Sequence, residues 1–165
     1  MKAISLWQPW ASAIATGAKR IETRSWRAPL SLYGQTIAIH AAKKPPHLIL
    51  RDFDQSLACG LLDAAGVVLS SDLPLGCIVA TMRLDRCPHI EEISIESRHA
   101  SRSVLSSDGG LSFAAPREEA LGDYSAGRYG WILEELRRLP EPIPCVGRQG
   151  FFDLPDRIVA ALELA

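Results

Sequence analysis

The chain has 165 residues, of which 47% are apolar and 22% charged, and its net charge is −1 at pH 7. This length fits one globular domain, here 1–165, whose core needs no disulfide or metal to stabilise it. The longest apolar runs are too short to span a bilayer and the first residues lack the apolar core of a secretory signal, so we expect a cytoplasmic protein without membrane contact.

The first third of the chain predicts a strand, a helix and a second strand. A short apolar strand over 3–6 precedes a helix that begins at Pro9 and ends at Gly17, because proline suits the first helical turn and glycine the left-handed cap. Residues 21–26 alternate as a strand does. The alternation places Ile21, Thr23 and Ser25 on one face and Glu22, Arg24 and Trp26 on the other.

The rest of the chain continues this pattern of short elements. A strand over 36–41 leads to helical spacing over 47–65, and an apolar, β-branched strand follows over 77–84. Residues 94–116 are rich in serine and glycine and predict a long, mobile insertion loop. The remaining predicted elements are a short acidic helix at 117–121, strands at 129–136 and 150–154, and a helix at 155–164.

Five or six short strands with helices between them are typical of an α+β fold, and we expect the strands to close into a small β-barrel. Periodicity alone goes no further.

The cysteines do not form a metal motif. Cys59, Cys77, Cys87 and Cys145 are far apart and none belongs to a Cys-x-x-Cys pair. The segments 89–91 and 144–145 resemble part of a zinc deaminase signature, but Arg148 stands where a second cysteine ligand would be required. The sequence therefore predicts no metal and no cofactor.

Charge is unevenly distributed along the chain. Residues 1–51 carry eight basic groups against one acidic group, a balance of +7, whereas the remainder carries ten against eighteen, a balance of −8. This asymmetry predicts a face that attracts anions, unless the fold mixes the charges in space.

The densest polar cluster lies in 17–24. Glu22 and Arg24 are two positions apart on one strand face, about 7 Å from each other, and Lys19 in the preceding turn can reach the same space. Arginine offers a planar fork suited to phosphate, lysine a point charge, and glutamate can orient both or accept a proton. A solvated salt-bridge ladder is the alternative, and spacing alone favours it.

These residues resemble the signature of the ASCH domain family, Gly-x-Lys-x-x-Glu-x-Arg, at Gly17, Lys19, Glu22 and Arg24. Nearly the whole chain except 94–116 takes part in the resemblance. Further matching segments are 5–11, 34–41, 75–80, 127–131 and 147–152.

The resemblance implies a PUA-like small β-barrel of five to six strands with flanking helices, which binds RNA or a nucleotide in a cleft beside the signature. Some members of the family resemble hydrolases, among them an acetylcytidine amidohydrolase branch and others to which ribonuclease activity is attributed. In the amidohydrolase branch a threonine, assigned as nucleophile, stands at the position of Glu22. Here Lys19 and Glu22 could act as an acid–base pair on a water, although a lysine held charged by glutamate is a poor base.

Other residues add candidates for ligand contact. Trp26 shares a face with Glu22 and Arg24 and is the strongest candidate for base stacking, whereas core packing is the alternative for each tryptophan and for Tyr129. His40, close to Lys43 and Lys44, could donate to a phosphate. The predicted site has Lys19 and Glu22 as catalytic candidates and, as ligand-binding candidates, Arg24, Trp26, Trp7, Gln8, His40, Lys43 and Tyr129.

Three functions remain open. A binding module would recognise RNA or a modified nucleoside or nucleotide through a basic cleft. An enzyme, an amidohydrolase or ribonuclease, would use the acid–base pair, and an adaptor would offer the basic face to an acidic protein. We expect a monomer in each case.

Overall fold

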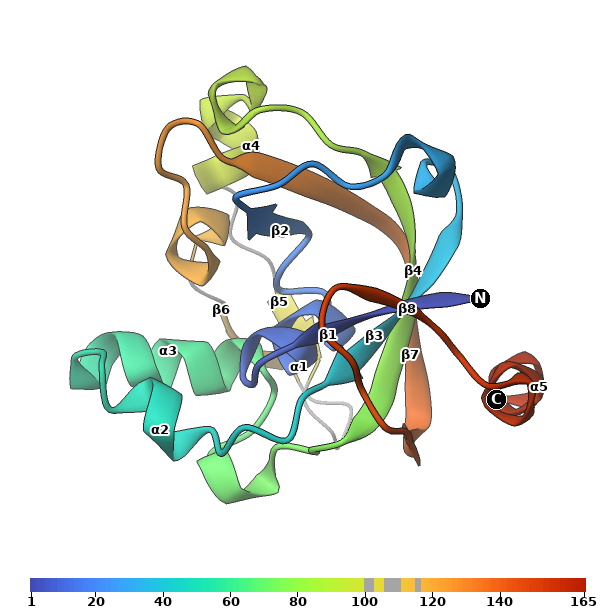
Figure 1. Cartoon of the computed structure of the whole chain (residues 1–165). Coiled ribbons are helices and arrows are strands. Elements are labelled where there is room, and N and C mark those ends of the chain that lie inside the picture. The colour runs from blue at the N-terminus through green and yellow to red at the C-terminus, as the bar shows by residue number, and fades with distance from the viewer. Residues whose placement is uncertain (100–102, 106–110, 115–116) are drawn as a thin grey trace.

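The structure is a computed structural model that describes residues 1–99, 103–105, 111–114 and 117–165. Its main feature is a six-stranded sheet with the order β2-β7-β4-β3-β1-β8 (Figure 1). In that sheet β1 and β3 run parallel and every other neighbouring pair is antiparallel. The strands are β1 (Lys2–Leu6), β2 (Ile21–Arg24), β3 (Thr36–Ala41), β4 (Cys77–Arg86), β7 (Tyr129–Pro144) and β8 (Phe151–Asp153).

The sheet curls so that its two edges approach each other. Trp26 lies two residues beyond the end of β2 at one edge, Phe151 lies in β8 at the other, and their ring centroids are 5.9 Å apart. Both rings also contact Trp131 of β7, at 4.7 and 5.1 Å. This curled half-barrel with flanking helices confirms the predicted α+β fold and small six-stranded barrel.

Alternation along the strands builds a core on each face of the sheet. Ile4 and Ile39 pack with Ile14 of α1 (Trp10–Ala15) inside the curl. Ala38 and Phe152 pack on the other face against α5 (Asp156–Leu164), which Figure 1 shows on the opposite side of the sheet from α1. Burial of each large apolar side chain contributes about 1.5–3 kcal/mol, so both layers stabilise the strands between them.

The turn from α1 into β2 depends on Gly17. Its φ of +83° is left-handed, and a Cβ at this position would lie 3.3 Å from Leu136. Glycine takes this conformation without strain, so the helix ends where predicted and the chain turns directly into the segment that carries Lys19.

Several predicted elements have other bounds in the structure. The strand predicted over 21–26 ends at Arg24, and the strand predicted over 77–84 extends to Arg86. The helical spacing over 47–65 forms two helices, α2 (His47–Leu50) and α3 (Gln55–Ala64), because the Asp54 carboxylate accepts a hydrogen bond from Leu57 N at 2.9 Å and begins a new helix. The strand predicted to end at Leu136 extends to Pro144, with a positive φ of 51° at Glu135.

The segment predicted as a loop over 94–116 contains regular structure. Its described residues form α4 (Ile95–His99) and a two-stranded sheet of β5 (Ser103–Leu105) and β6 (Leu111–Ala114). Residues 100–102, 106–110 and 115–116 lie outside the described residues, and mobility of the segment stays a prediction.

Short 3₁₀ turns connect the larger elements. They are η1 (Leu30–Leu32), η2 (Ser70–Asp72), η3 (Ile90–Glu92) and η4 (Glu118–Leu121), the last of which lies within the predicted acidic helix. In the described part of the chain no helix is long and apolar enough to cross a bilayer.

Candidate functional site

A cavity of about 550 Å³ lies where the ends of β1 and β2 meet the start of α1, α3 and the end of η4. Its size is within the range of small-ligand sites. Aromatic rings and charged groups line it together: Trp7, Trp10, Trp26 and Phe53, with Lys19, Glu22, Arg24, Asp123 and Arg128.

Lys19 is buried beneath this cavity, with only 1% of its surface exposed. Its Nζ donates hydrogen bonds to Ile21 O at 2.6 Å and Leu121 O at 2.8 Å, and lies 3.7 Å from Glu22 Oε2. The Lys19 side chain is therefore directed at three acceptors, two main-chain oxygens and one carboxylate.

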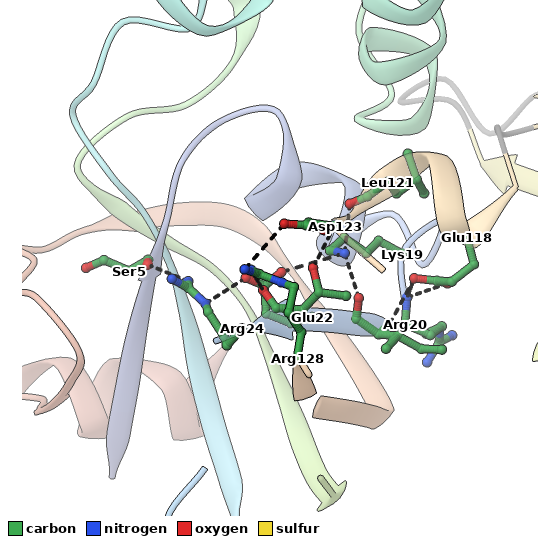
Figure 2. A network of polar contacts seen from close by, with 11 residues as sticks. Ser5, Lys19, Arg20, Glu22, Arg24, Glu118, Leu121, Asp123 and Arg128 are labelled. Carbon is green, nitrogen blue, oxygen red and sulfur yellow. Dashed lines mark hydrogen bonds and ion pairs between the residues drawn. The ribbon is translucent and has the colours of Figure 1, made fainter. Parts of the chain in front are cut away.

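Glu22 joins Lys19 to Arg24. Its Oε1 lies 2.9 Å from Arg24 Nε, and Arg24 Nη2 donates to the main-chain oxygen of Ser5 at 3.4 Å. Figure 2 shows these side chains in one polar network that extends from Ser5 to Glu118. Because β2 ends at Arg24, the network links the edge strand β2 to β1 and holds a carboxylate and a guanidinium side by side at the cavity wall.

A second acid fixes the turn that carries Lys19. The carboxylate of Glu118, which is fully buried, accepts hydrogen bonds from Arg20 N at 3.1 and 2.9 Å and from Ile21 N at 3.0 Å. Since Lys19 donates in return to Leu121 O, η4 and the start of β2 hold each other in place from both ends of the 3₁₀ turn.

The segment after η4 completes the wall. Asp123 N donates to Thr23 Oγ1 at 3.0 Å, and the Asp123 carboxylate lies 3.3 Å from Arg128 Nη1. Hydrogen bonds from Ser125, with the charge of Arg128 as a smaller cause, hold the pKa of Asp123 below its usual range. Three cations and two carboxylates thus line the cavity, a balance of +1 in which each cation lies beside a carboxylate.

Several predicted ligand contacts share this cavity. The ligand-binding candidates Trp7, Arg24 and Trp26 line it, as do the catalytic candidates Lys19 and Glu22. Trp7 is half exposed, with Lys44 Nζ 3.6 Å from its ring centroid. Trp26 is 38% exposed and packs at steep angles against Trp131 and Phe151.

Four predicted ligand contacts lie elsewhere. Gln8 is buried at the start of α1. Its Nε2 donates hydrogen bonds to Ser12 Oγ and Pro74 O, and its Oε1 accepts one from Ser12 N, so its amide is engaged within the fold. Tyr129 is not among the residues that line the cavity; its ring packs against His89 and lies beneath Arg27. His40 and Lys43 line a different cavity.

Sequence reasoning did not assign a role in the site to Thr23, Phe53, Asp123 or Arg128. Arg128 lies in segment 127–131, which resembles the family, so the resemblance could have pointed to it. Phe53 belongs to the apolar stripe of 47–65, which indicated that its side chain faces the interior. Nothing in the sequence distinguishes Asp123 from other surface acids, because its position depends on how η4 packs. Among the described residues no three histidines, cysteines or acids converge to hold a metal ion.

Known proteins resemble this chain in sequence and in fold. The sequence profile of the ASCH domain matches residues 4–139, a range that includes every residue lining the cavity. The human protein activating signal cointegrator 1 is 33% identical over 84 residues, which are 51% of this chain, and the chain spans only 14% of that protein's length.

Solved structures share the fold. The crystal structure of ASCH from Zymomonas mobilis superimposes with a TM-score of 0.53 at 18% identity, over 99% of this chain and 93% of that one. A Y-to-F mutant of the same protein gives 0.52 at 17% identity, over 99% and 96%. These likenesses establish that the chain has the fold of solved ASCH structures, and the profile match over most of the chain places this protein in the ASCH domain family.

Proposed function

We propose that this domain binds a nucleoside, free or within RNA, with the base in the cavity beside the signature residues. The observation that carries the proposal is the combination, in one hollow of about 550 Å³, of tryptophan rings with the adjacent Arg24 guanidinium and Glu22 carboxylate. Aromatic rings stack on bases with about 1–3 kcal/mol for each base, and an arginine or a carboxylate can read the donors and acceptors on a base edge.

The charge balance favours an uncharged ring over a bare phosphate in this cavity. Lys19 is directed at two carbonyl oxygens and Glu22, and Arg24 and Arg128 each lie beside a carboxylate. A phosphate would have to compete with these fixed partners, whereas a base can stack on Trp26 or Trp7 and extend the existing hydrogen bonds.

Titration of the protein with nucleosides tests the proposal. Isothermal calorimetry and tryptophan fluorescence would be recorded with adenosine, cytidine, guanosine, uridine and N4-acetylcytidine. At least one should bind, and Arg24→Gln should weaken it about tenfold or more because a charge-assisted contact is lost. Arg86→Gln removes an exposed cation outside this cavity and should leave the affinity unchanged. The absence of binding by every nucleoside at millimolar concentration would overturn the proposal.

Hydrolysis of the bound nucleoside or of RNA is a second candidate. The observation that favours it is the Glu22 carboxylate at the cavity wall, where it can orient a water. The partners of Lys19 argue against that residue as the base. Chromatography of N4-acetylcytidine and of RNA after incubation with the protein tests this candidate: product that disappears with Glu22→Gln supports it, and intact substrate rejects it.

A further inference from the structure

A second cavity, of about 320 Å³, borders the first at the end of β1. Its lining contains Ser5, His40 and Lys43 together with the segment 146–149 that precedes β8. Ser5 belongs to both cavities. Its main-chain oxygen accepts the hydrogen bond from Arg24, and its hydroxyl lies 3.1 Å from His40 Nδ1 and 2.9 Å from Arg148 O.

The charges of the second cavity differ in kind from those of the first. Two cations, Lys43 and Arg148, line it, and its lining includes no acid. In the part of the chain that the structure describes, neither cation forms an ion pair. Both side chains are exposed and free to meet an anion.

Backbone packing fixes the walls of this cavity. A Cβ on Gly147 would lie 2.8 Å from Ser5 Oγ and would overlap the His40 ring, so this main chain rests directly on β1 and β3. Gly76 plays a similar part for Lys43, since a Cβ there would lie 3.1 Å from Lys43 Cγ. The lysine stem therefore lies along the Gly76 backbone, which orders the side chain before any ligand arrives.

The same segment offers main-chain donors. The N–H groups of Gly147, Arg148 and Gln149 donate no hydrogen bond to any acceptor among the described residues. Unpaired main-chain N–H groups beside lysine and arginine are the donor set that proteins use for phosphate oxygens.

We propose that this second cavity is a phosphate subsite, which holds a phosphate of the nucleotide or RNA chain whose base occupies the first cavity. The inference rests on the proposed function, because the shared residue Ser5 is what makes the two cavities neighbours. The protein would then recognise the two parts of one ligand in two places, the base in the charge-balanced first cavity and the phosphate in the second cavity, whose lining contains no acid.

The test compares nucleosides with their phosphorylated forms. Affinities would be measured for the five nucleosides named above, for their 3′- and 5′-monophosphates, for dinucleotides and for inorganic pyrophosphate. For the best nucleoside, one phosphorylated form should bind about tenfold more tightly, which corresponds to about 1.4 kcal/mol. The form that gains identifies whether a terminal phosphate or a phosphodiester is held.

Matched variants assign that gain to the second cavity. Lys43→Gln and Arg148→Gln, both at exposed side chains, should each remove most of the gain and leave the affinity for the nucleoside unchanged. Arg86→Gln is the control, because Arg86 stands at the far end of β4 from Gly76, about 30 Å along the strand. That variant should keep the full gain.

Each adverse outcome has its own meaning. Equal affinity for nucleoside and nucleotide, or equal weakening of both by Lys43→Gln, would overturn the phosphate subsite and leave the proposed function standing. If no nucleoside or nucleotide binds, the proposed function fails and the subsite fails with it, unless pyrophosphate binds in a manner that Arg148→Gln abolishes. Binding of polyglutamate without any nucleotide would replace both by an acidic protein partner.

Discussion

Lys19 belongs to the family signature and also stabilises the fold, so its functional and structural roles are difficult to separate by mutation. Its ammonium supports two main-chain oxygens and one carboxylate, so it stabilises both the edge of β2 and the orientation of Glu22. A loss of function in a Lys19 variant therefore does not by itself identify a catalytic lysine, because removal of the side chain also removes the support of the cavity wall.

We predict that Lys19→Met lowers the free energy of unfolding by about 3–5 kcal/mol, the usual cost of breaking a buried ion pair and leaving its partners unpaired. Urea unfolding followed by far-ultraviolet circular dichroism measures it. Lys2→Met is the matched control, since Lys2 pairs with Asp153 at the surface and should cost less than about 1 kcal/mol. Equal unfolding midpoints for Lys19→Met and the wild type would show that the buried network contributes nothing to stability.

At the scale of one element, η4 acts as a clamp on the start of β2. Two adjacent acids in this turn have different environments: Glu118 is buried on main-chain N–H groups, and Glu119 lies 3.2 Å from His99 at the surface. Their sequence context is nearly the same, so the sequence predicts a short acidic helix here without revealing which acid supports the site.

This difference gives a prediction for the pair. Glu118→Gln should destabilise the protein by about 1.5–3 kcal/mol, because charge-assisted hydrogen bonds to Arg20 and Ile21 are weakened. Hydrogen exchange of these two amides should accelerate, and nucleoside affinity should fall with it. Glu119→Gln should change none of these three quantities measurably. Unchanged exchange at Ile21 in Glu118→Gln would mean that η4 does not hold the strand.

Other elements show where local pattern is enough and where it fails. The strand at 36–41 and the C-terminal helix follow from alternation and proline chemistry alone. The strand has the predicted bounds, and the helix begins one residue after Pro155 and ends at Leu164 as predicted. The pattern over 47–65 is continuous in hydrophobicity, yet Asp54 divides it, because an N-cap side chain outweighs apolar spacing over a few residues.

For the whole molecule, the sequence predicted which residues belong to the candidate site better than it predicted which of them share one cavity. The sequence and its resemblance brought Lys19, Glu22, Arg24 and Trp26 together, and the cavity contains all four. It could not separate His40 and Lys43 from them, because that division depends on the curl of the sheet and on the path of 146–149 across β1 and β3.

The contact of segment 146–149 with β1 and β3 also makes the stability of the protein at acid pH depend on one histidine, His40. Burial lowers the pKa of His40, and the charge of Lys43 lowers it further, although a hydrogen bond to Cys145 O acts in the opposite direction. The neutral ring donates from Nε2 to that oxygen and presents the Nδ1 lone pair to the Ser5 hydroxyl.

Because the pKa of His40 is lower in the folded state than its ordinary value of about 6.5, the unfolded chain binds the extra proton first as the pH falls. Stability is therefore complete above about pH 6.5 and declines below it, by at most about 1.4 kcal/mol per pH unit for one proton.

Urea unfolding between about pH 7.5 and 5 should show a steeper decline in the wild type than in His40→Gln, whatever the variant's stability at neutral pH. Carboxylates with lowered pKa, Glu91, Asp123 and Asp153, titrate at lower pH and do not obscure this window. Parallel pH profiles for the two proteins would mean that the folded protein tolerates a charged imidazole at position 40. The Ser5 hydroxyl would then donate its hydrogen bond to Arg148 O, with no loss of stability.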